Sequence, residues 1–282
     1  MIVAYLTSGY FKWAELFLKS LKLSNGTKYP VFLNTRDLSP GQLHTLRTIY
    51  PNLEIDNRQL NVKALSKKHN IPAATILASR KACEGDKATG NHRLWMNITA
   101  DGDRIVSLRD VINSHPTPKA FLHLDIDLLF RGSLDEVFNL GAKNNVGLIC
   151  RKGGPPSNRI PLNSIVLNAK NSLDSIVIIS AVSIQNTPEG KRFMDKWVSY
   201  VNSSPMSKRN HCKWGQFAAW KTFCDLQKEL SFFRFPVGCI NDRFSPKAHA
   251  KMWYPKKKSK DDQYSQMMAE YRRLLKLGHG VG

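Results

Sequence analysis

The sequence has few cysteines and no long hydrophobic run, and each shortage excludes a class of protein. Its 282 residues include five cysteines, an odd number, and none of them stands in a C-x-x-C pair. This usage argues against a disulfide framework or a structural zinc site, and it favours a reducing compartment. The longest apolar-rich run, Ser175 to Ile184, is too short to cross a bilayer. The stretch MIVAYLTSGYFKW has no basic segment and no long apolar core, so we expect no signal peptide.

Acidic residues are scarce beside basic ones. Lysine and arginine number 42 against 22 aspartates and glutamates, which gives a formal net charge of +20. Such an excess favours polyanionic partners, either nucleic acid or an anionic membrane face. It also suits a small molecule with a diphosphate group, and a generally basic surface is the alternative. We expect a cytoplasmic protein, in the host cytoplasm if the gene belongs to a phage, with peripheral membrane contact as a further option.

The first sixty residues alternate between strand and helix patterns. The expected elements are a strand at Ile2–Leu6, a helix at Phe11–Leu23, a strand at Tyr29–Asn34, a helix from Ser39-Pro40 to Ile49, and a strand at Leu53–Ile55. Strands that alternate with helices of this length predict a mainly parallel, doubly wound α/β sheet flanked by helices.

The rest of the chain continues this alternation less regularly. Further elements are predicted at Arg104–Ser114 (helix), Phe121–Phe130 (strand), Leu134–Asn139 (helix), Val146–Cys150 (strand), SIVIISAVSIQN (strand), Pro188–Val201 (helix) and about Gln263–Leu277 (helix), with a loop at Arg151–Arg159. We expect one α/β domain at residues 1–245 and a basic C-terminal segment at residues 246–282 that packs on it or extends it.

Two aspartates interrupt the most apolar stretch of the chain, FLHLDIDLLF at Phe121–Phe130. In a strand, His123, Asp125 and Asp127 project to one face, because side chains alternate. The two aspartates start about 6.6 Å apart at Cα, at about 3.3 Å per residue. They can therefore converge on one divalent cation. The alternative is a strand end at which both aspartates meet water or cap the next turn.

The residues around these aspartates resemble a known family. HLDIDLLFRGSLDEVF matches, at both aspartates, the following Gly-Ser and the small helix, the metal-binding D-x-D segment of nucleotide-sugar glycosyltransferases with the GT-A fold. The pattern is closest to the glycogenin and lipopolysaccharide galactosyltransferase-like (family 8-like) group. Three later pieces, AVSIQNTPEGKRFMDKW, HCKWGQFAAW and CINDRF, occur in the family's order. The resemblance covers about residues 1 to 260.

The resemblance implies a donor site and a metal site. Asp125 and Asp127 would bind Mn²⁺ or Mg²⁺, with His249 as a third ligand, and a UDP-sugar is the expected donor. The donor would be bound by residues of the turn after the first strand, by an arginine at a helix start and by a lysine clamp: Thr7, Ser8, Gly9, Tyr10, Arg104, Lys256 and Lys260. An ordinary βα turn, a solvated Arg104 and a surface His249 are the alternatives.

The resemblance also implies the chemistry. Asp127 is the expected catalytic aspartate, and Gln216 would lie beneath the sugar of a retaining enzyme, as a weak nucleophile or charge stabiliser. The family's Asp-Gln pair is here Gly215-Gln216, so the acceptor-contacting aspartate is absent. The family's C-terminal H-x-x-G-x-x-K segment is not reproduced either.

The acceptor and two rival functions remain open at this point. The charge favours a polyanionic acceptor, either modified bases in DNA or an anionic lipid or surface glycan. A nucleotidyltransferase would also use paired aspartates and a metal, but the first strand is not followed by a glycine-rich phosphate loop. A non-catalytic nucleic-acid-binding protein on an α/β scaffold would not need Asp125 or Asp127.

Overall fold

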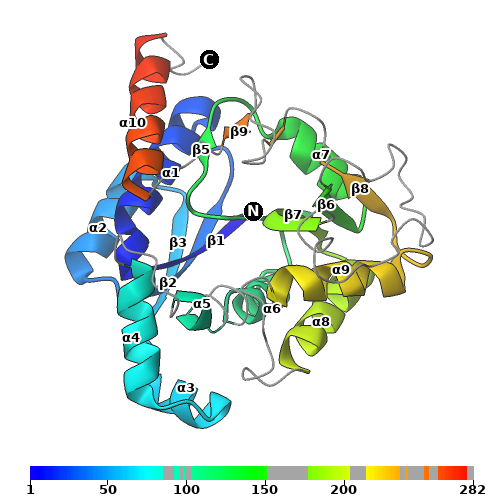
Figure 1. Cartoon of the computed structure of the whole chain (residues 1–282). Coiled ribbons are helices and arrows are strands. Elements are labelled where there is room, and N and C mark those ends of the chain that lie inside the picture. The colour runs from blue at the N-terminus through cyan, green and yellow to red at the C-terminus, as the bar shows by residue number, and fades with distance from the viewer. Residues whose placement is uncertain are drawn as a thin grey trace. The chain divides into compact units, whose positions relative to one another are not determined.

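In the computed structural model the chain forms two compact units. Figure 1 labels their helices and strands. It describes residues 1–84, 92–95, 98, 103–150, 177–203, 214–235, 239–240, 251–253 and 260–277. The first unit combines Met1–Leu60, Leu124–Phe138 and Pro236–Gly282, and the second combines Asn61–His123 and Asn139–Phe235. The expected mixed α/β class is confirmed, whereas the expected boundary at residue 245 stays a prediction. The predicted loop at residues 151–159 lies outside the described residues.

The first unit contains the predicted β-α-β-α-β pattern. Strands β1 (Ile2–Thr7), β2 (Val31–Arg36) and β3 (Leu53–Arg58) lie side by side and are parallel. In their register Thr7 is opposite Arg36, and Arg36 is opposite Arg58. All three strands therefore end at the same edge, which is where ligands gather in parallel sheets.

The helices between these strands follow from local sequence signals. Helix α1 (Phe11–Asn25) buries one apolar face, including Trp13 and Phe17, and ends before Gly26, whose φ of +60° suits glycine. Helix α2 (Pro40–Ile49) begins with a capping box in which the side chains of Ser39 and Gln42 each accept a hydrogen bond from the other's backbone N–H.

The predicted strand Phe121–Phe130 is wrong as a single element. Strand β4 (Ala120–Leu124) ends before the aspartates, and β5 (Leu129–Phe130) pairs instead with β9 (Met252–Trp253) in a separate antiparallel ribbon. The apolar residues after the aspartates are buried because they pack on helix α1 and not because they continue β4. The ring of Phe130 packs edge-to-face on Phe17 of α1, with ring centroids 4.8 Å apart.

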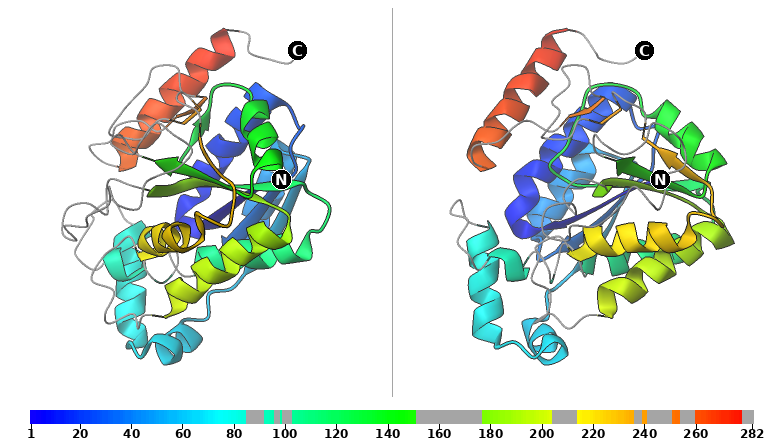
Figure 2. Two further views of the ribbon diagram at one scale, coloured as in Figure 1. Left: turned by 90° about the vertical axis from the view of Figure 1, so that its right-hand side faces the viewer. Right: turned by 45° about the vertical axis from the view of Figure 1, so that its right-hand side comes forward.

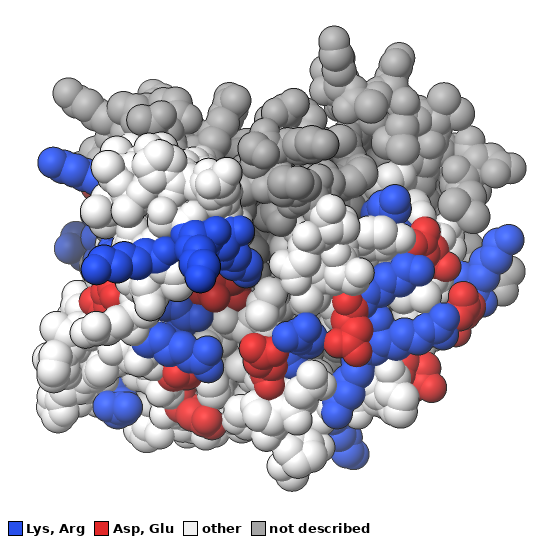
Figure 3. Space-filling model, turned by 90° about the horizontal axis from the view of Figure 1, so that it is seen from below, with Lys and Arg blue, Asp and Glu red and all other residues white. Residues whose placement is uncertain are grey.

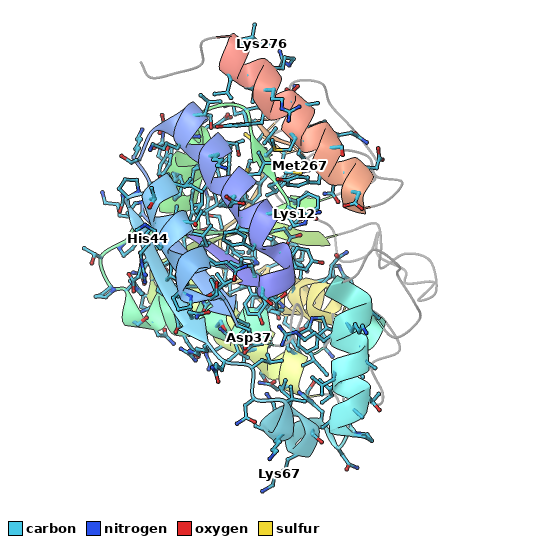
Figure 4. All side chains as sticks on the ribbon, turned by 90° about the vertical axis from the view of Figure 1, so that its left-hand side faces the viewer. Lys12, Asp37, His44, Lys67, Met267 and Lys276 are labelled. Carbon is cyan, nitrogen blue, oxygen red and sulfur yellow. The ribbon has the colours of Figure 1, made fainter. Side chains whose placement is uncertain are left out.

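The C-terminal helix α10 (Lys260–Lys276) belongs to the first unit and begins three residues before the predicted Gln263. It packs beside α1 (Figure 4). The rings of Tyr264 and Trp13 meet edge-to-face, with centroids 5.1 Å apart. Lys12 of α1 forms an ion pair with Asp261 at 3.2 Å. Met267 is fully buried. The helix is therefore fastened by apolar and by polar contacts.

The second unit contributes four neighbouring strands, in the order β4-β7-β6-β8, to a seven-stranded sheet. Its other strands are β6 (Val146–Cys150), β7 (Val177–Gln185) and β8 (Phe232–Arg234). Strand β6 is parallel to β8 but antiparallel to β7, so the pairing departs here from the parallel rule. The helices are α3 (Val62–His69), α4 (Ala73–Glu84), α5 (His92–Trp95), α6 (Arg104–Ser114), α7 (Asp135–Lys143, shared between the units), α8 (Pro188–Asn202) and α9 (Trp214–Leu226).

Helices α8 and α9 pack side by side in this unit (Figure 2). As the sequence predicted, α8 buries Phe193, Met194 and Trp197. The indole N–H of Trp197 donates to the carbonyl oxygen of Gly215 at 2.8 Å. This bond fixes the first turn of α9 and with it the position of Gln216. Among the described residues, no helix is both long enough and apolar enough to span a membrane.

One buried hydroxyl gives a test of this fold. The Ser20 hydroxyl, on α1, donates to the carbonyl oxygen of Phe17 and accepts from the backbone N–H of Phe130. Ser20→Ala removes the acceptor and leaves that buried N–H unpaired, so we expect the free energy of unfolding to fall by about 1–3 kcal/mol. Urea unfolding measures the change.

The matched control is Thr48→Ala on the exposed face of α2, where the lost hydrogen bond joins the hydroxyl to His44 O. A change within about 0.5 kcal/mol is expected there. Equal effects of the two substitutions would contradict the assigned role of Ser20.

Candidate functional site

The predicted donor turn lies at the carboxyl end of β1. Ser8–Tyr10 form a single 3₁₀ turn, closed by the N–H of Phe11 on the carbonyl oxygen of Ser8, and α1 follows directly. Thr7 is 4% exposed, and its hydroxyl has no hydrogen-bond partner among the residues that the structure describes. A buried hydroxyl without a partner costs free energy, so Thr7 stays a candidate for the predicted donor contact.

Asp125 and Asp127 lie in the short link between β4 and β5. Both are half-buried, whereas Ile126 and Leu128 beside them are buried. The amide Nε2 of Gln263 on α10 donates to Oδ2 of Asp127 at 3.3 Å. The predicted alternation is thus realised without a strand: the apolar side chains of the link enter the core, and the carboxylates stay partly accessible.

Backbone contacts hold the far end of this link. The N–H of Phe130 donates to Ser20 at 3.1 Å, and the N–H of Arg131 donates to the carbonyl oxygen of Lys251 at 2.7 Å. The Asn25 side chain donates to Gly132 O at 3.2 Å and accepts from the N–H of Leu134 at 3.0 Å. Residues more than a hundred positions apart therefore fix where the aspartates stand.

An ion pair joins α10 to the end of the same link. The guanidinium of Arg131 lies 2.9 Å from the carboxylate of Glu270, and both side chains are less than 15% exposed. Arg273 forms two further hydrogen bonds to Glu270, at 2.8 Å each. The hydrogen bonds from Arg273, with the charges of both arginines, hold the pKa of Glu270 below its ordinary value, although burial opposes the shift.

The carboxylate pair fits a divalent cation that is shared with a substrate. No group of three or more His, Cys, Asp or Glu side chains suited to a metal occurs in the described part of the chain. Two carboxylates alone suit Mn²⁺ or Mg²⁺, since Mg²⁺ is usually bound through one or two carboxylates together with phosphate groups and water. The predicted third ligand, His249, lies outside the described residues.

The other predicted site residues are distributed over both units. Lys260 begins α10 in the first unit, and Lys256 lies outside the described residues. In the second unit Arg104 begins α6 as expected and is half-buried. Gln216 is 9% exposed, and its Nε2 lacks a hydrogen-bond partner among described residues. His123, on the aspartate face in the predicted strand, is a buried residue of β4.

Sequence reasoning missed two residues that support the aspartates. Ser20 lies on the face of α1 whose other residues are apolar. A serine at an apolar position of the helix pattern is the local signal that could have singled it out. Gln263 was predicted merely as the start of a helix. Its contact with Asp127 joins residues 136 positions apart, which no local pattern predicts.

No protein-family model and no curated protein matches the sequence. Solved structures do resemble the chain. The galactosyltransferase LgtC, in complex with donor and acceptor sugar analogues, is 10% identical over 100% of this chain and 98% of that chain, with a TM-score of 0.51. Mouse xyloside xylosyltransferase 1 is 11% identical over 89% of this chain and 95% of that chain, with a TM-score of 0.45.

The glycosyltransferase GlyE of Streptococcus pneumoniae TIGR4 is 14% identical, with a TM-score of 0.46. The match covers 86% of this chain and 45% of GlyE, so the chain spans less than half the length of that protein. The full-length likeness to LgtC shows the fold: the chain has the GT-A fold that the sequence predicts.

The ion pair between α10 and the link gives a prediction. Glu270→Gln removes the charge that Glu270 places beside the largely buried Arg131, so we expect the free energy of unfolding to fall by about 1–3 kcal/mol at neutral pH. Because the folded-state pKa of Glu270 is lowered, its contribution is complete above the unfolded value of about 4.3 and is lost as the pH falls through the folded value. Urea unfolding of both proteins at neutral pH and near pH 4 measures this.

Glu229→Gln is the control, because Glu229 pairs with Arg192 on the surface, where both side chains are about half exposed. A loss below about 1 kcal/mol is expected there. A Glu270→Gln effect that does not shrink in acid would contradict the electrostatic explanation.

Proposed function

We propose that this chain is a metal-dependent glycosyltransferase that moves a sugar from a nucleoside diphosphate sugar, with UDP as the expected nucleotide, to an anionic acceptor. In the reaction the bond between the anomeric carbon and the diphosphate oxygen breaks, and a bond from the anomeric carbon to an acceptor oxygen forms. The acceptor loses a proton, and the nucleoside diphosphate leaves.

One observation carries the proposal. On a chain with the GT-A fold, two partly accessible carboxylates, Asp125 and Asp127, lie in the link that follows β4. A rigid support behind a pair of acidic side chains is what a metal site needs, and the buried contacts of Ser20 and Arg131 provide it.

Asp125 and Asp127 would hold the cation. A bound Mn²⁺ or Mg²⁺ neutralises the charge that develops on the departing diphosphate. The hydroxyl of Thr7 would form a hydrogen bond with the nucleotide, as donor or acceptor. Ser8, Gly9 and Tyr10 belong to the same turn and would also contact the donor. This assignment explains why a buried hydroxyl at the end of β1 has no partner in the described part of the protein.

Further roles are proposed for Gln216, Arg104, Lys256, Lys260 and His249, each by itself. Gln216 is buried, and its amide nitrogen has no hydrogen-bond partner among the residues that the structure describes. It would lie beneath the sugar, where its carbonyl oxygen would stabilise positive charge near the anomeric carbon. Arg104, Lys256 and Lys260 would supply cations to the diphosphate. His249 is the proposed third metal ligand. Retention of anomeric configuration goes with this role for Gln216.

An anionic acceptor is proposed from the net charge of +20. Figure 3 shows one face of the molecule, on which the described lysine and arginine side chains alternate with aspartate and glutamate. That face is therefore not a continuous basic surface. An anionic acceptor is therefore proposed from the composition of the whole chain, and its chemical class is left to the assay below.

Transfer assays decide the acceptor and the stereochemistry. Duplex DNA with hydroxymethylated bases, vesicles with anionic glycolipid and a neutral oligosaccharide would each receive a labelled sugar. Transfer to the neutral oligosaccharide alone would contradict an anionic acceptor. NMR of the product gives the anomeric configuration, and an inverted product would remove the role proposed for Gln216.

The carboxylate pair gives the central prediction. Asp125→Asn combined with Asp127→Asn should abolish the Mn²⁺-dependent release of nucleoside diphosphate from its sugar conjugate, because two neutral amides cannot replace two anionic ligands. The assay uses UDP-, GDP-, ADP- and TDP-sugars with and without Mn²⁺. Asp110→Asn, which alters an exposed pair on α6, should leave release unchanged.

Release that survives the double substitution would contradict the metal site. Release of sugar 1-phosphate in place of nucleoside diphosphate, with transfer of the nucleoside monophosphate to an acceptor, would indicate a nucleotidyltransferase. If neither product forms and no free diphosphate binds in the presence of Mn²⁺, the proposed activity is wrong.

The unpaired hydroxyl of Thr7 predicts opposite effects on stability and binding. Thr7→Val keeps the shape and removes a buried polar group without a described partner, so the free energy of unfolding should rise by about 1 kcal/mol. The affinity for UDP with Mn²⁺ should fall about fivefold to tenfold, the worth of one hydrogen bond. Thermal or urea unfolding and isothermal titration measure the two quantities.

Thr222→Val is the matched control, since the buried Thr222 hydroxyl donates to Ala218 O at 2.8 Å on α9. It should lower stability and leave UDP affinity unchanged. A Thr7→Val protein that binds UDP as tightly as the wild type would remove Thr7 from the donor site.

A further inference from the structure

Gln263 on α10 is almost completely buried, with 1% of its surface exposed. Its amide Nε2 lies 3.3 Å from Oδ2 of Asp127. An ionised carboxylate only accepts hydrogen bonds, so the amide must present its N–H₂ to Asp127 and not its oxygen. The orientation of the Gln263 amide is therefore set by the aspartate.

The place of Gln263 on its helix is itself tightly constrained. Asp261, two residues earlier, pairs with Lys12, and Tyr264, the next residue, packs on Trp13. Two turns further along, Glu270 pairs with Arg131 at the end of the aspartate link. These contacts hold the first turn of α10 on α1 and keep the amide at a fixed point relative to Asp127.

We propose that Gln263 is a positioning residue for the metal site: its hydrogen bond to Oδ2 helps to hold the carboxylate plane of Asp127. The inference rests on the proposed function, and it adds the C-terminal helix to the machinery of that site. Partners that orient a metal ligand typically change metal affinity by about 10–100-fold when they are removed.

The hydrogen bond between Gln263 and Asp127 is expected to affect the affinity for the metal as well as the stability of the fold. A half-buried carboxylate can rotate about its terminal torsion, which is broad and only weakly constrained. A cation that binds to both aspartates restricts that rotation further when it binds. A buried amide that already restricts it lowers the cost of ordering the ligand.

A pair of matched substitutions separates this role from simple packing. Gln263→Met keeps the length of the side chain and removes its donor. Gln266→Met makes the same change on the same helix, where the amide of Gln266 donates to Asp262 at 3.0 Å. Both variants lose one hydrogen bond to a carboxylate, but only the first loses a bond to Asp127.

The probe is Mn²⁺ in the presence of UDP, and free Mn²⁺ is followed by electron paramagnetic resonance without any sugar donor. We expect Gln263→Met to weaken Mn²⁺ binding about tenfold or more and Gln266→Met to leave it unchanged. Unfolding in metal-free buffer should be similar for the two variants, which shows that α10 is still docked.

Three outcomes overturn the inference. If Gln263→Met binds Mn²⁺ as the wild type does, while the double aspartate variant does not bind it, Gln263 has no positioning role and the proposed function stands. If Gln266→Met weakens binding equally, the effect comes from the helix as a whole. If the wild type and the double aspartate variant bind Mn²⁺ alike, the proposed metal site fails and the inference fails with it.

Discussion

The first unit depends on how the chain is held after it leaves β4. The link that carries Asp125 and Asp127 has no strand partner of its own until Leu129, and its far end is fixed by single contacts from distant parts of the chain. Chief among them is the Ser20 hydroxyl, which satisfies the buried N–H of Phe130. An unpaired N–H at that position would cost about as much as a typical destabilising mutation. The hydroxyl therefore determines where a pair of carboxylates can be placed.

The same region shows how a strongly basic chain uses its few acidic residues. On α10, Asp261 and Glu270 both pair with cations of other elements, Lys12 and Arg131. The pair of Arg131 and Glu270 is largely shielded from water, so it resists screening by salt far better than an exposed pair does. The acidic residues of this helix thus contribute to docking it, and they direct a C-terminal segment of a positively charged protein toward the aspartate link.

Helices and strands whose structure depends mainly on their own residues could be predicted from the sequence. The apolar periodicity of α1, the Ser39-Pro40 start of α2 and the alternation of strands and helices in the first sixty residues all have local causes, and the structure confirms them. The family pattern around the aspartates predicted the GT-A fold, and the likeness to LgtC confirms it.

The prediction failed where two distant segments decide the structure together. The run FLHLDIDLLF has the composition of one strand, but its last residues pair with β9 and pack on α1. Nothing within those ten residues predicts that they pair with β9 or pack on α1. The antiparallel pairing of β6 with β7 was missed for a similar reason, because strand direction is set by the path of the connection and not by the residues of the strand.

Two protein carboxylates have a consequence for the order of binding under the proposed function. A cation of this kind takes about six ligands, so Asp125 and Asp127, even with the proposed third ligand His249, leave several positions to water and to substrate. Weak binding of the cation alone is then expected, and a diphosphate that supplies further oxygens makes the two ligands bind cooperatively. Such a site holds its metal firmly only while a donor or a leaving nucleotide is present. Under the proposed function, the contact from α10 would lower the cost of ordering Asp127, and the preference for a diphosphate would follow from the ligand positions that the protein leaves open.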